Sequence, residues 1–590
     1  MLIKPNHVAA TFGKQSPWNM SSVIFVFVFL FSACVPQATA VPSDISATPI
    51  ISSSIKISTF TPGPVLTSNS NAVPTALREQ LVSLKLPANT SIRVDVPSKA
   101  NQNATPVPWV YALVAPFPTT MDGVTSAELE LAWTQGTVPA AFSGHPLLMD
   151  ESTLAAFKAL WDEPASGLVR TVPSDQLLDT AWSELGSWAI IPFEALHPKW
   201  KVLTIDGQSP IRKGFDISKY PLVVNFDVQS KNSSQLVSNY DPSKLTTVLM
   251  TGITALVRAT AYTMELKSIT YPGEKIRDLM READITHLAN HVPFSTGCTF
   301  PKPDQGWLVF CSDPKYIDLF TDVGVDLVEL TGHHFEDYGP KATLETLEIY
   351  KAHNIVYFGG GANKDDAIKP ALFENHGNKI AFIGCNRLDT GGLPTATDDR
   401  PGAAPCDYDY LKGKISQLRA EGYVVIATMH WNQSYGYQPA PQQVKDFHFL
   451  VDAGASLVLG AQAHYAQTME FYKDIFVHYG QGNLFFDQMG DQSWMPKGIR
   501  REFLDRYVIY NGQLISVELI TAMLEDYSRP RLMTDAERVG FLEEYFNYSG
   551  WTKFPPTPTA TITPTLTPMS IPSLAGTSTP RLLSTATPTP

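Results

Sequence analysis

The chain has 590 residues, which is room for two or three domains, and its hydrophobic content of 44% is ordinary for a globular protein. Its formal net charge is −13 and its isoelectric point is about 5.5, which makes nucleic acid an unsuitable partner.

The N-terminus has the pattern of an export signal. Lys4 and Lys14 precede a short apolar run, residues 23–31, which Ser32, Ala33 and Cys34 follow. The run is shorter than the roughly 20 residues of a typical spanning helix. Residues 31–34 resemble a bacterial lipobox, so we expect a signal peptide over 1–33 and a lipid on Cys34. An uncleaved anchor and an ordinary signal peptide are the alternatives, and all three place the folded part outside the cytoplasm. We expect a lipid-anchored, extracytoplasmic protein at the cell membrane.

Two segments of low complexity bracket the folded part. Residues 34–75 are rich in Ser, Thr, Pro and Ala, and residues 555–590 consist largely of Thr-Pro repeats. Neither composition can bury a core, so both are predicted to be extended spacers. The first would hold a domain away from a membrane.

A first domain is predicted over residues 76–237, where strand-like runs alternate with a helix-like stretch at 153–161. The predicted strands are 109–115, 188–191, 201–205 and 222–226. A turn-rich boundary at residues 239–242 ends this domain. Asp122, Ser152, Thr153 and Arg170 could contact an anion, although helix caps and surface groups explain them more simply.

A second domain is predicted over residues 244–550. Val444, Phe447 and Val451 lie on one face of a helix that Gly454 ends. The predicted strands are 245–250, 325–330, 379–383, 423–428, 457–459 and 475–479.

Histidine segments follow three of these strands. They contain His333 and His334, then His430, then His464. Polar residues just past strand ends point into the crevice where α/β folds build their sites. Each histidine alone could be a structural group, but imidazoles from separate loops are how proteins assemble metal or phosphate sites.

The cysteines agree with export. Apart from Cys34 there are four, an even number that suggests disulfides in an exported chain. Local pairing joins Cys298 to Cys311 and Cys385 to Cys406. Four free buried thiols are the alternative.

The ordered motifs of residues 244–550 resemble the CapA family, named for capsule (poly-γ-glutamate) synthesis. The family pattern runs G-D-x-x-x-x-R, N-x-E, A-N-N-H-x-x-D-x-G, G-x-G-x-N-x-x-x-A, H-W-G, G-H-x-H and G-N-F. The matching positions are Gly252 with Arg258, Asn290, His334 with Asp337 and Gly339, Gly359 to Asn363 with Ala367, His430 with Trp431, Gly460 with His464, and Gly482 to Leu484. The resemblance implies an α/β fold with a four-layer α/β/β/α sandwich of metallophosphatase type and a site at the loop ends.

The chain departs from this pattern at the metal ligands. Ile253 stands where the family has Asp, the N-x-E acid is Val292 or His291, and Gln462 replaces a histidine. Carboxylates neutralise and bridge hard divalent ions, so their loss weakens a two-metal site. We expect one divalent ion, zinc or manganese, or no metal at all.

Pieces of the first domain, such as residues 111–117 and 188–196, resemble extracytoplasmic solute-binding proteins of the phosphate-binding class. The segment is short for a two-lobed binding protein, so one lobe or a compact relative is expected.

The CapA resemblance also implies the roles of the site residues. By position in the motifs, the catalytic residues are His334, as general acid, and Asp337. The predicted metal ligands are His333, His430, His464 and Gln462. The predicted substrate-binding residues are Arg258, Asn290, Asn363 and Asn483.

Two functions fit these expectations. The first is an envelope protein of capsule or poly-γ-glutamate biosynthesis or export whose degenerate site binds an anionic surface polymer or its synthesis machinery. The second is an active metal-dependent hydrolase or transferase on a phosphate ester or a polymer amide. Loss of both carboxylates favours binding, so enzymatic activity is left open.

Overall fold

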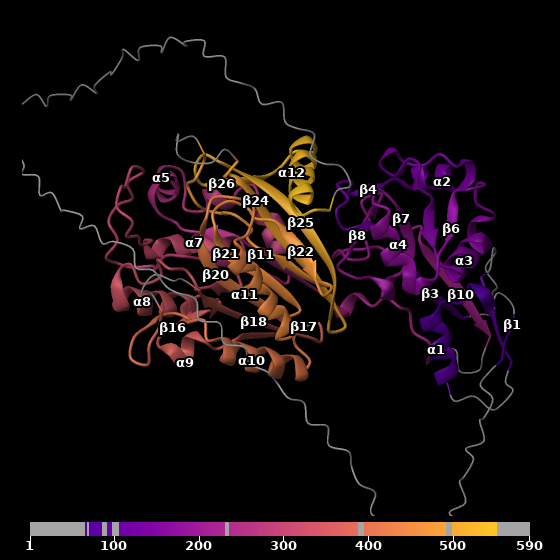
Figure 1. Cartoon of the computed structure of the whole chain (residues 1–590), viewed down its shortest axis with the longest axis horizontal. Helices are drawn as coiled ribbons and strands as arrows, with labels where there is room; N and C mark the ends of the chain where they lie inside the picture. Colours follow the sequence, from indigo (N-terminus) through magenta and orange to yellow (C-terminus); the bar gives the residue numbers. More distant parts are fainter. Residues whose placement is uncertain are drawn as a thin grey trace, which may run out of the picture. The chain divides into compact units, whose positions relative to one another are not determined.

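The structure of the chain is a computed structural model (Figure 1). It describes residues 65–67, 70–84, 91–96, 105–229, 235–387, 395–490 and 498–551. The chain divides at Phe60, and all described residues belong to the unit Thr61–Pro590. Within these ranges no helix is long and apolar enough to cross a membrane. The predicted signal peptide, Cys34 and the C-terminal tail lie outside the described residues.

The first sheet is built by residues 65–229. Its strands are ordered β1-β2-β10-β3-β7-β5-β6, and β8 also pairs with β3. Their bounds are β1 Val65–Thr67, β2 Ser91–Asp95, β3 Thr105–Pro116, β5 Leu147–Met149, β6 Val169–Thr171, β7 Trp188–Pro192, β8 Trp200–Val202 and β10 Val223–Gln229. A separate pair joins β4 Gly123–Val124 to β9 Thr204–Ile205. The helices are α1 Thr75–Ser83, α2 Ser126–Gln135, α3 Glu151–Trp161 and α4 Leu177–Ser183.

Burial of large aromatic side chains holds this sheet to its helices. Trp109 on β3 and Trp188 on β7 are fully buried, as is Phe157 on α3. Helix α3 begins where the Asp150 carboxylate accepts a hydrogen bond from the backbone N–H of Thr153 at 2.7 Å. Residues 150–153 therefore form a helix cap, the simpler of the two explanations that the sequence allowed.

The predicted linker is wrong over its last residues. Val65–Thr67 forms β1, which pairs in parallel with β2, and Ala72 and Val73 are buried. The β-branched and apolar residues of this segment suit an edge strand, which the surrounding Ser, Thr and Pro residues hide in the composition. The predicted division at residues 238–243 separates the first sheet from the later ones, and independent folding of residues 76–237 stays a prediction.

The C-terminal part contains two mixed sheets. The first is ordered β15-β14-β13-β11-β24-β25-β26, with β12 paired to β13, and the second is ordered β17-β18-β20-β21-β23-β22. In the first, the bounds are β11 Leu245–Thr251, β12 Ile253–Thr254, β13 Ile285–Asn290, β14 Leu327–Glu329, β15 Val356–Phe358, β24 Arg501–Tyr510, β25 Gln513–Glu525 and β26 Arg529–Leu532. In the second, they are β17 Ala371–Asn375, β18 Asn378–Asn386, β20 Val424–Ser434, β21 Leu457–Ala463, β22 Met469–Tyr472 and β23 Ile475–His478.

Eight helices of the C-terminal part are described. Their bounds are α5 Arg258–Leu266, α6 Arg277–Glu282, α7 Ile317–Asp322, α8 Gly339–Ala352, α9 Lys364–Ala367, α10 Tyr408–Ala420, α11 Pro441–Asp452 and α12 Asp535–Tyr548. A short pair, β16 Gly360–Gly361 with β19 Gly402–Ala403, lies beside α9.

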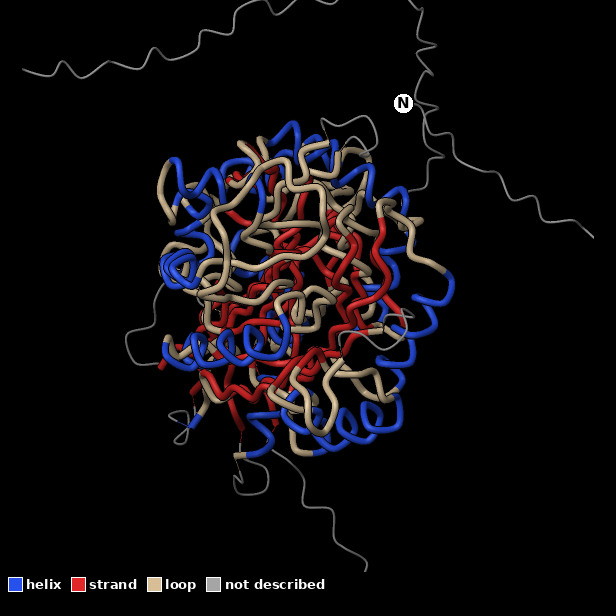
Figure 2. The backbone as a smooth tube through the Cα atoms, turned by 90° about the vertical axis from the view of Figure 1, so that its left-hand side faces the viewer, coloured by secondary structure: helices blue, strands red, loops and turns tan. Residues whose placement is uncertain are grey.

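Side chains that alternate in direction along the strands contribute to three separate hydrophobic cores. On β11, Val248 belongs to the core shared by the two sheets, whereas Leu249 belongs to the core beneath α5 to α8. On β20, Ile426 belongs to the shared core, whereas Val425 belongs to the core beneath α10 and α11. Since neighbouring residues of a strand face opposite sides, the two sheets pack face to face with helices on their outer faces. Figure 2 shows the helices around the strands.

Candidate functional site

The predicted site residues gather where parallel strands of the two sheets end. His291 follows β13, His333 and His334 follow β14, His430 lies near the end of β20, and His464 follows β21. Strands β13 and β14 are parallel neighbours in one sheet, and β20 and β21 are parallel neighbours in the other. The polar side chains therefore come from matching edges of both sheets.

Backbone contacts join the two sheets at this edge. The Ile253 N–H donates to the Gly482 carbonyl at 3.0 Å, and the Leu484 N–H donates to the Ile253 carbonyl at 2.7 Å. A Cβ on Gly252 would lie 2.1 Å from the Gly482 oxygen, so no larger residue fits there. A Cβ on Gly332 would likewise lie 2.7 Å from the His291 Cα. Gly252 therefore lets β12 approach the loop that contains Gly482, and Gly332 lets the segments that follow the neighbouring strands β13 and β14 lie close together.

Four histidines form a cluster: His291, His333, His334 and His430. His333 Nδ1 and His430 Nε2 are 3.3 Å apart. The ring centroids of His291 and His430 are 4.9 Å apart, and those of His333 and His334 are 3.9 Å apart. His291 was the alternative register at the N-x-E motif, and the structure makes it a member of the cluster.

Burial keeps most of these imidazoles neutral. It lowers the pKa of His333 to about 3, and the pKa values of His291 and His430 lie well below the usual 6.5. Neighbouring imidazoles add to the lowering of each pKa, because a second positive charge nearby would repel the first, and the Gln462 side chain opposes it for His291. At neutral pH these three side chains offer lone pairs and N–H groups, not positive charge.

The two predicted catalytic residues are in contact. His334 Nδ1 lies 2.6 Å from the Asp337 Oδ2, which also accepts a hydrogen bond from the Phe310 N–H at 2.8 Å. The Phe310 ring packs edge-on against His334, with centroids 4.9 Å apart. Asp337 therefore orients the His334 ring and leaves its Nε2 for other partners.

Arg258 and Asp487 form a buried ion pair at the start of α5. Nε and Nη2 of Arg258 both donate to the Asp487 carboxylate, which also accepts from the Ala259 N–H at 3.1 Å. The guanidinium lies over the rings of Phe310 and Phe486, at 5.4 and 4.9 Å from their centroids. Burial raises the pKa of Asp487, and Arg258 opposes that rise. Arg258 has a positive φ of 47°, a conformation that costs energy in a non-glycine residue.

His464, the fifth histidine of the site, has its own hydrogen-bonding partner and influences the pKa values of three histidines of the cluster only through its charge. Its Nδ1 lies 2.8 Å from the Asn483 Oδ1, and the Asn483 amide donates to Gln488 at 3.1 Å. Its ring stacks between Tyr435 and Phe486. Burial lowers the pKa of His464 to about 4, while Asn483 opposes this effect.

Two predicted substrate-binding residues have hydrogen-bonding partners within the chain, and their binding of a substrate stays a prediction. The Asn290 amide donates to the Val292 carbonyl and to the Tyr350 hydroxyl, both at 2.8 Å. Asn363 accepts from the Asp366 N–H at 2.9 Å and caps α9. Asn363 was taken from a glycine-rich motif whose chain leads into this helix, so its amide is committed to the cap.

The metal ion that the resemblance implies has no ready set of ligands. In the part of the chain that the structure describes, no three His, Cys, Asp or Glu side chains are arranged to hold one. The His333–His430 spacing does match the roughly 3.3 Å between two nitrogens on a tetrahedral zinc ion. His430 Nδ1 and Gln462 Oε1 are buried without a hydrogen-bonding partner, and Gln462 has a positive φ of 79°. A full ligand set for a metal ion would require side chains to move.

Both predicted disulfides are confirmed. Cys298 pairs with Cys311 and Cys385 pairs with Cys406, with Cα–Cα distances of 5.9 and 5.0 Å. The first closes the loop that carries Phe310 to the histidine cluster.

Comparison with known proteins identifies the class of the C-terminal part. Residues 247–488 match the family described as bacterial capsule synthesis protein PGA_cap. The chain is 30% identical over 172 residues to the capsule biosynthesis protein CapA of Bacillus anthracis, covering 28% of this chain and 41% of that protein. It is 27% identical over 178 residues to the PGA biosynthesis protein CapA of Bacillus subtilis, covering 30% and 47%. The chain thus spans about half the length of these relatives.

Solved structures share only a distant likeness. The NAD nucleotidase of Haemophilus influenzae is 12% identical with a TM-score of 0.29, covering 52% of this chain and 62% of that one. An ABC-type phosphate transport receptor from Vibrio cholerae is 12% identical with a TM-score of 0.23, covering 29% and 90%.

Proposed function

We propose that this chain is an extracytoplasmic, membrane-anchored protein of capsule or poly-γ-glutamate biosynthesis, whose crevice binds the anionic polymer without hydrolysing it. The similarity to CapA proteins supports the biosynthetic role. The main evidence for binding without hydrolysis is that both carboxylates beside the histidines already have partners. Asp337 accepts from His334, and Asp487 is paired with Arg258, so neither is free to bridge metal ions.

The remaining groups suit an amide-linked polyacid. Each unit of poly-γ-glutamate presents one carboxylate and one amide. Neutral imidazoles and the Gln462 amide can donate to and accept from such groups, whereas the charge of Arg258 is already balanced by Asp487. The chain carries a net charge of −13, so binding must depend on this local arrangement.

Calorimetric titration with poly-γ-glutamate oligomers tests the proposal. We expect saturable, salt-sensitive binding that weakens about tenfold in His334→Gln, because one hydrogen-bonding imidazole ring is lost. The exposed His353, which bonds only to its own helix at Ile349, provides the control variant His353→Gln. Equal affinities for the native protein and both variants would place the polymer elsewhere.

A hydrolase or transferase is the second candidate, and the His334–Asp337 contact favours it. With Nδ1 held by Asp337, the Nε2 of His334 can take a proton from water or return one to a leaving group. Shortening of the polymer on gels, lost in Asp337→Asn at unchanged oligomer affinity, would support catalysis. Polymer of constant length over long incubation with divalent ions would leave binding alone.

Membrane attachment is part of the same proposal. Cys34 would carry the lipid after cleavage behind Ala33, and the first sheet would serve as a solute-binding-like module. Mass spectrometry of the mature N-terminus tests the anchor: a diacylglyceryl cysteine is expected, and an intact Met1 would contradict it.

A further inference from the structure

A second cavity lies between β25 and α12 on one side and the loops that follow β3 and β8 on the other. It has a volume of about 270 Å³, and none of the residues that line it belongs to the histidine cluster. Ligand pockets for drug-sized molecules span roughly 300–1,000 Å³. The cavity therefore suits a small molecule and not a polymer.

One wall of the cavity is apolar and well anchored. Phe117 packs against Phe471, Phe476 and Trp551 with ring centroids 5.3 to 5.6 Å apart. Phe546 lies close by, at 6.2 Å from the Phe117 centroid. An apolar ligand body would find a preformed surface here.

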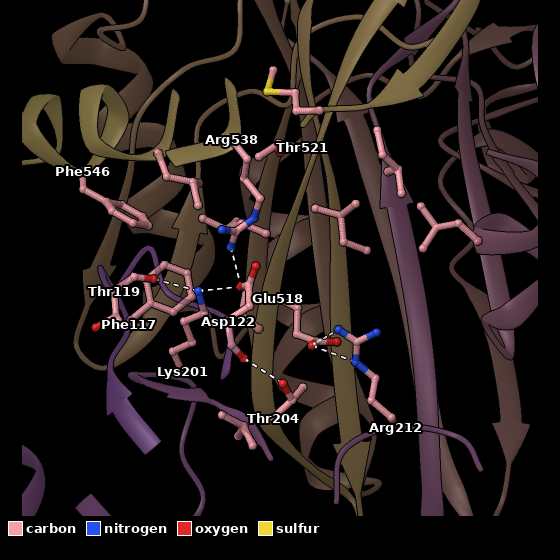
Figure 3. Close-up of a pocket in the computed structure, with 18 residues that line it drawn as sticks. Phe117, Thr119, Asp122, Lys201, Thr204, Arg212, Glu518, Thr521, Arg538 and Phe546 are labelled. Carbon is pink, nitrogen blue, oxygen red and sulfur yellow. Dashed lines mark hydrogen bonds and ion pairs between the residues drawn. The ribbon is translucent and has the colours of Figure 1, made fainter. Parts of the chain in front are cut away.

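The cavity lining also carries three cations and two carboxylates. Arg212 donates to Glu518 through two nitrogens, at 3.0 and 2.7 Å. Lys201 and Arg538 share the single carboxylate of Asp122, at 2.8 and 2.6 Å (Figure 3). The lining therefore has an excess of one positive charge.

Asp122 lies between two cations that each have a second hydrogen-bonding partner. Its side chain is 59% exposed, whereas those of Lys201 and Arg538 are each 16% exposed. Lys201 also donates to the Thr119 carbonyl at 2.8 Å, and Arg538 donates to the Thr120 carbonyl at 2.6 Å. If Asp122 turned toward solvent, these carbonyls would keep both cations in place.

We propose that this cavity binds a small organic monocarboxylate, whose acid group replaces Asp122 between Lys201 and Arg538 and whose apolar body lies against Phe117 and Phe546. The two cations already hold one carboxylate, which shows the chemistry that the position accepts. The excess positive charge matches a single anionic group.

Binding of a carboxylate beside Lys201 should depend on the charge of this lysine. Burial lowers its pKa to about 8, and Asp122 and Glu518 oppose that change while Arg538 adds to it. Arg212, the remaining charged group of the lining, is paired with Glu518. Lys201 is therefore mainly charged at pH 7 and mainly neutral at pH 9, so affinity for a carboxylate should fall across this interval.

Calorimetry on the full chain tests the proposal with hydrocinnamate, an apolar ring on a short carboxylate, and with its neutral amide as the matched control. Saturable binding of the acid is expected, with at least tenfold weaker binding of the amide. Lys201→Gln should weaken binding by a similar factor. Asp122→Asn should tighten it, because the competing internal carboxylate is removed.

Further variants separate binding from folding. Leu542→Trp fills the cavity and should abolish binding, while Lys219→Gln changes an exposed lysine, 74% accessible, that pairs only with Asp216. Thermal unfolding identifies any variant that fails to fold. If Lys201→Gln or Leu542→Trp does not fold, the tighter binding expected for Asp122→Asn tests the proposal. The proposal is overturned if neither the native protein nor Asp122→Asn binds hydrocinnamate at about 10 mM, or if acid and amide bind equally.

Discussion

Acid should destabilise the C-terminal part between pH 6.5 and 4 through its buried histidines. His291, His333, His430 and His464 have pKa values lowered by burial, and that of His464 falls to about 4. In the unfolded chain each regains an ordinary pKa near 6.5, so the unfolded state binds more protons in this interval. Stability therefore rises with pH through the window and is lost as the pH falls.

The size of the effect follows from the two pKa values. For His464, a native pKa of about 4 against 6.5 unfolded amounts to about 3 kcal/mol of lost stability at pH 4. His333 is only partly buried, so we expect less from it. Each fully buried imidazole should contribute a slope of about 1.4 kcal/mol per pH unit near pH 5. Glu502, whose pKa burial raises well above its usual value, acts in the opposite direction.

Urea unfolding of chelator-treated protein at several pH values measures the slope. His430→Asn removes one titrating ring and should lower the slope near pH 5 by about 1.4 kcal/mol per pH unit. His353→Asn, at an exposed position, should leave it unchanged. A native slope near zero between pH 6.5 and 5, or equal slopes in both variants, would refute the assignment of neutral buried imidazoles.

Three further predictions concern the ion pair, the close backbone contact and the metal content of the site. Asp487→Ala leaves Arg258, whose side chain is 17% exposed, without its partner and should cost up to about 3 kcal/mol in urea unfolding. A loss below about 1 kcal/mol would mean that the pair is hydrated in solution. Gly252→Ala should prevent close approach of the sheets and destabilise the protein strongly, because its Cβ would meet the Gly482 oxygen at 2.1 Å. The matched control Gly413→Ala, inside α10 and facing open space, should stabilise by up to about 1 kcal/mol, and equal effects would contradict the packing argument. Elemental analysis should find at most one divalent metal per chain, whereas two stoichiometric ions would show that the motif register is mistaken.

Much of the local structure could be read from the sequence. The apolar runs 245–250, 379–383 and 475–479 are the strands β11, β18 and β23, and the helical spacing of residues 444–451 is α11. These predictions succeed because side-chain burial repeats every two residues on a strand and every 3.6 on a helix. The predicted strand 201–205 is instead interrupted at Leu203, which separates β8 from β9. Local cysteine spacing was likewise enough to pair both disulfides.

The sequence by itself determined several strands, two of the helices, both disulfides and the polar residues that follow three of the strands. Only the tertiary structure decided which of those polar residues meet. It brought His291 to His430 from the other sheet, committed Asn363 to a helix cap, and paired Arg258 with Asp487, 229 positions later. Sheet order and sheet-on-sheet packing set these contacts, and burial among them sets the pKa values. Such properties depend on residues that are distant in the chain, which local patterns do not contain.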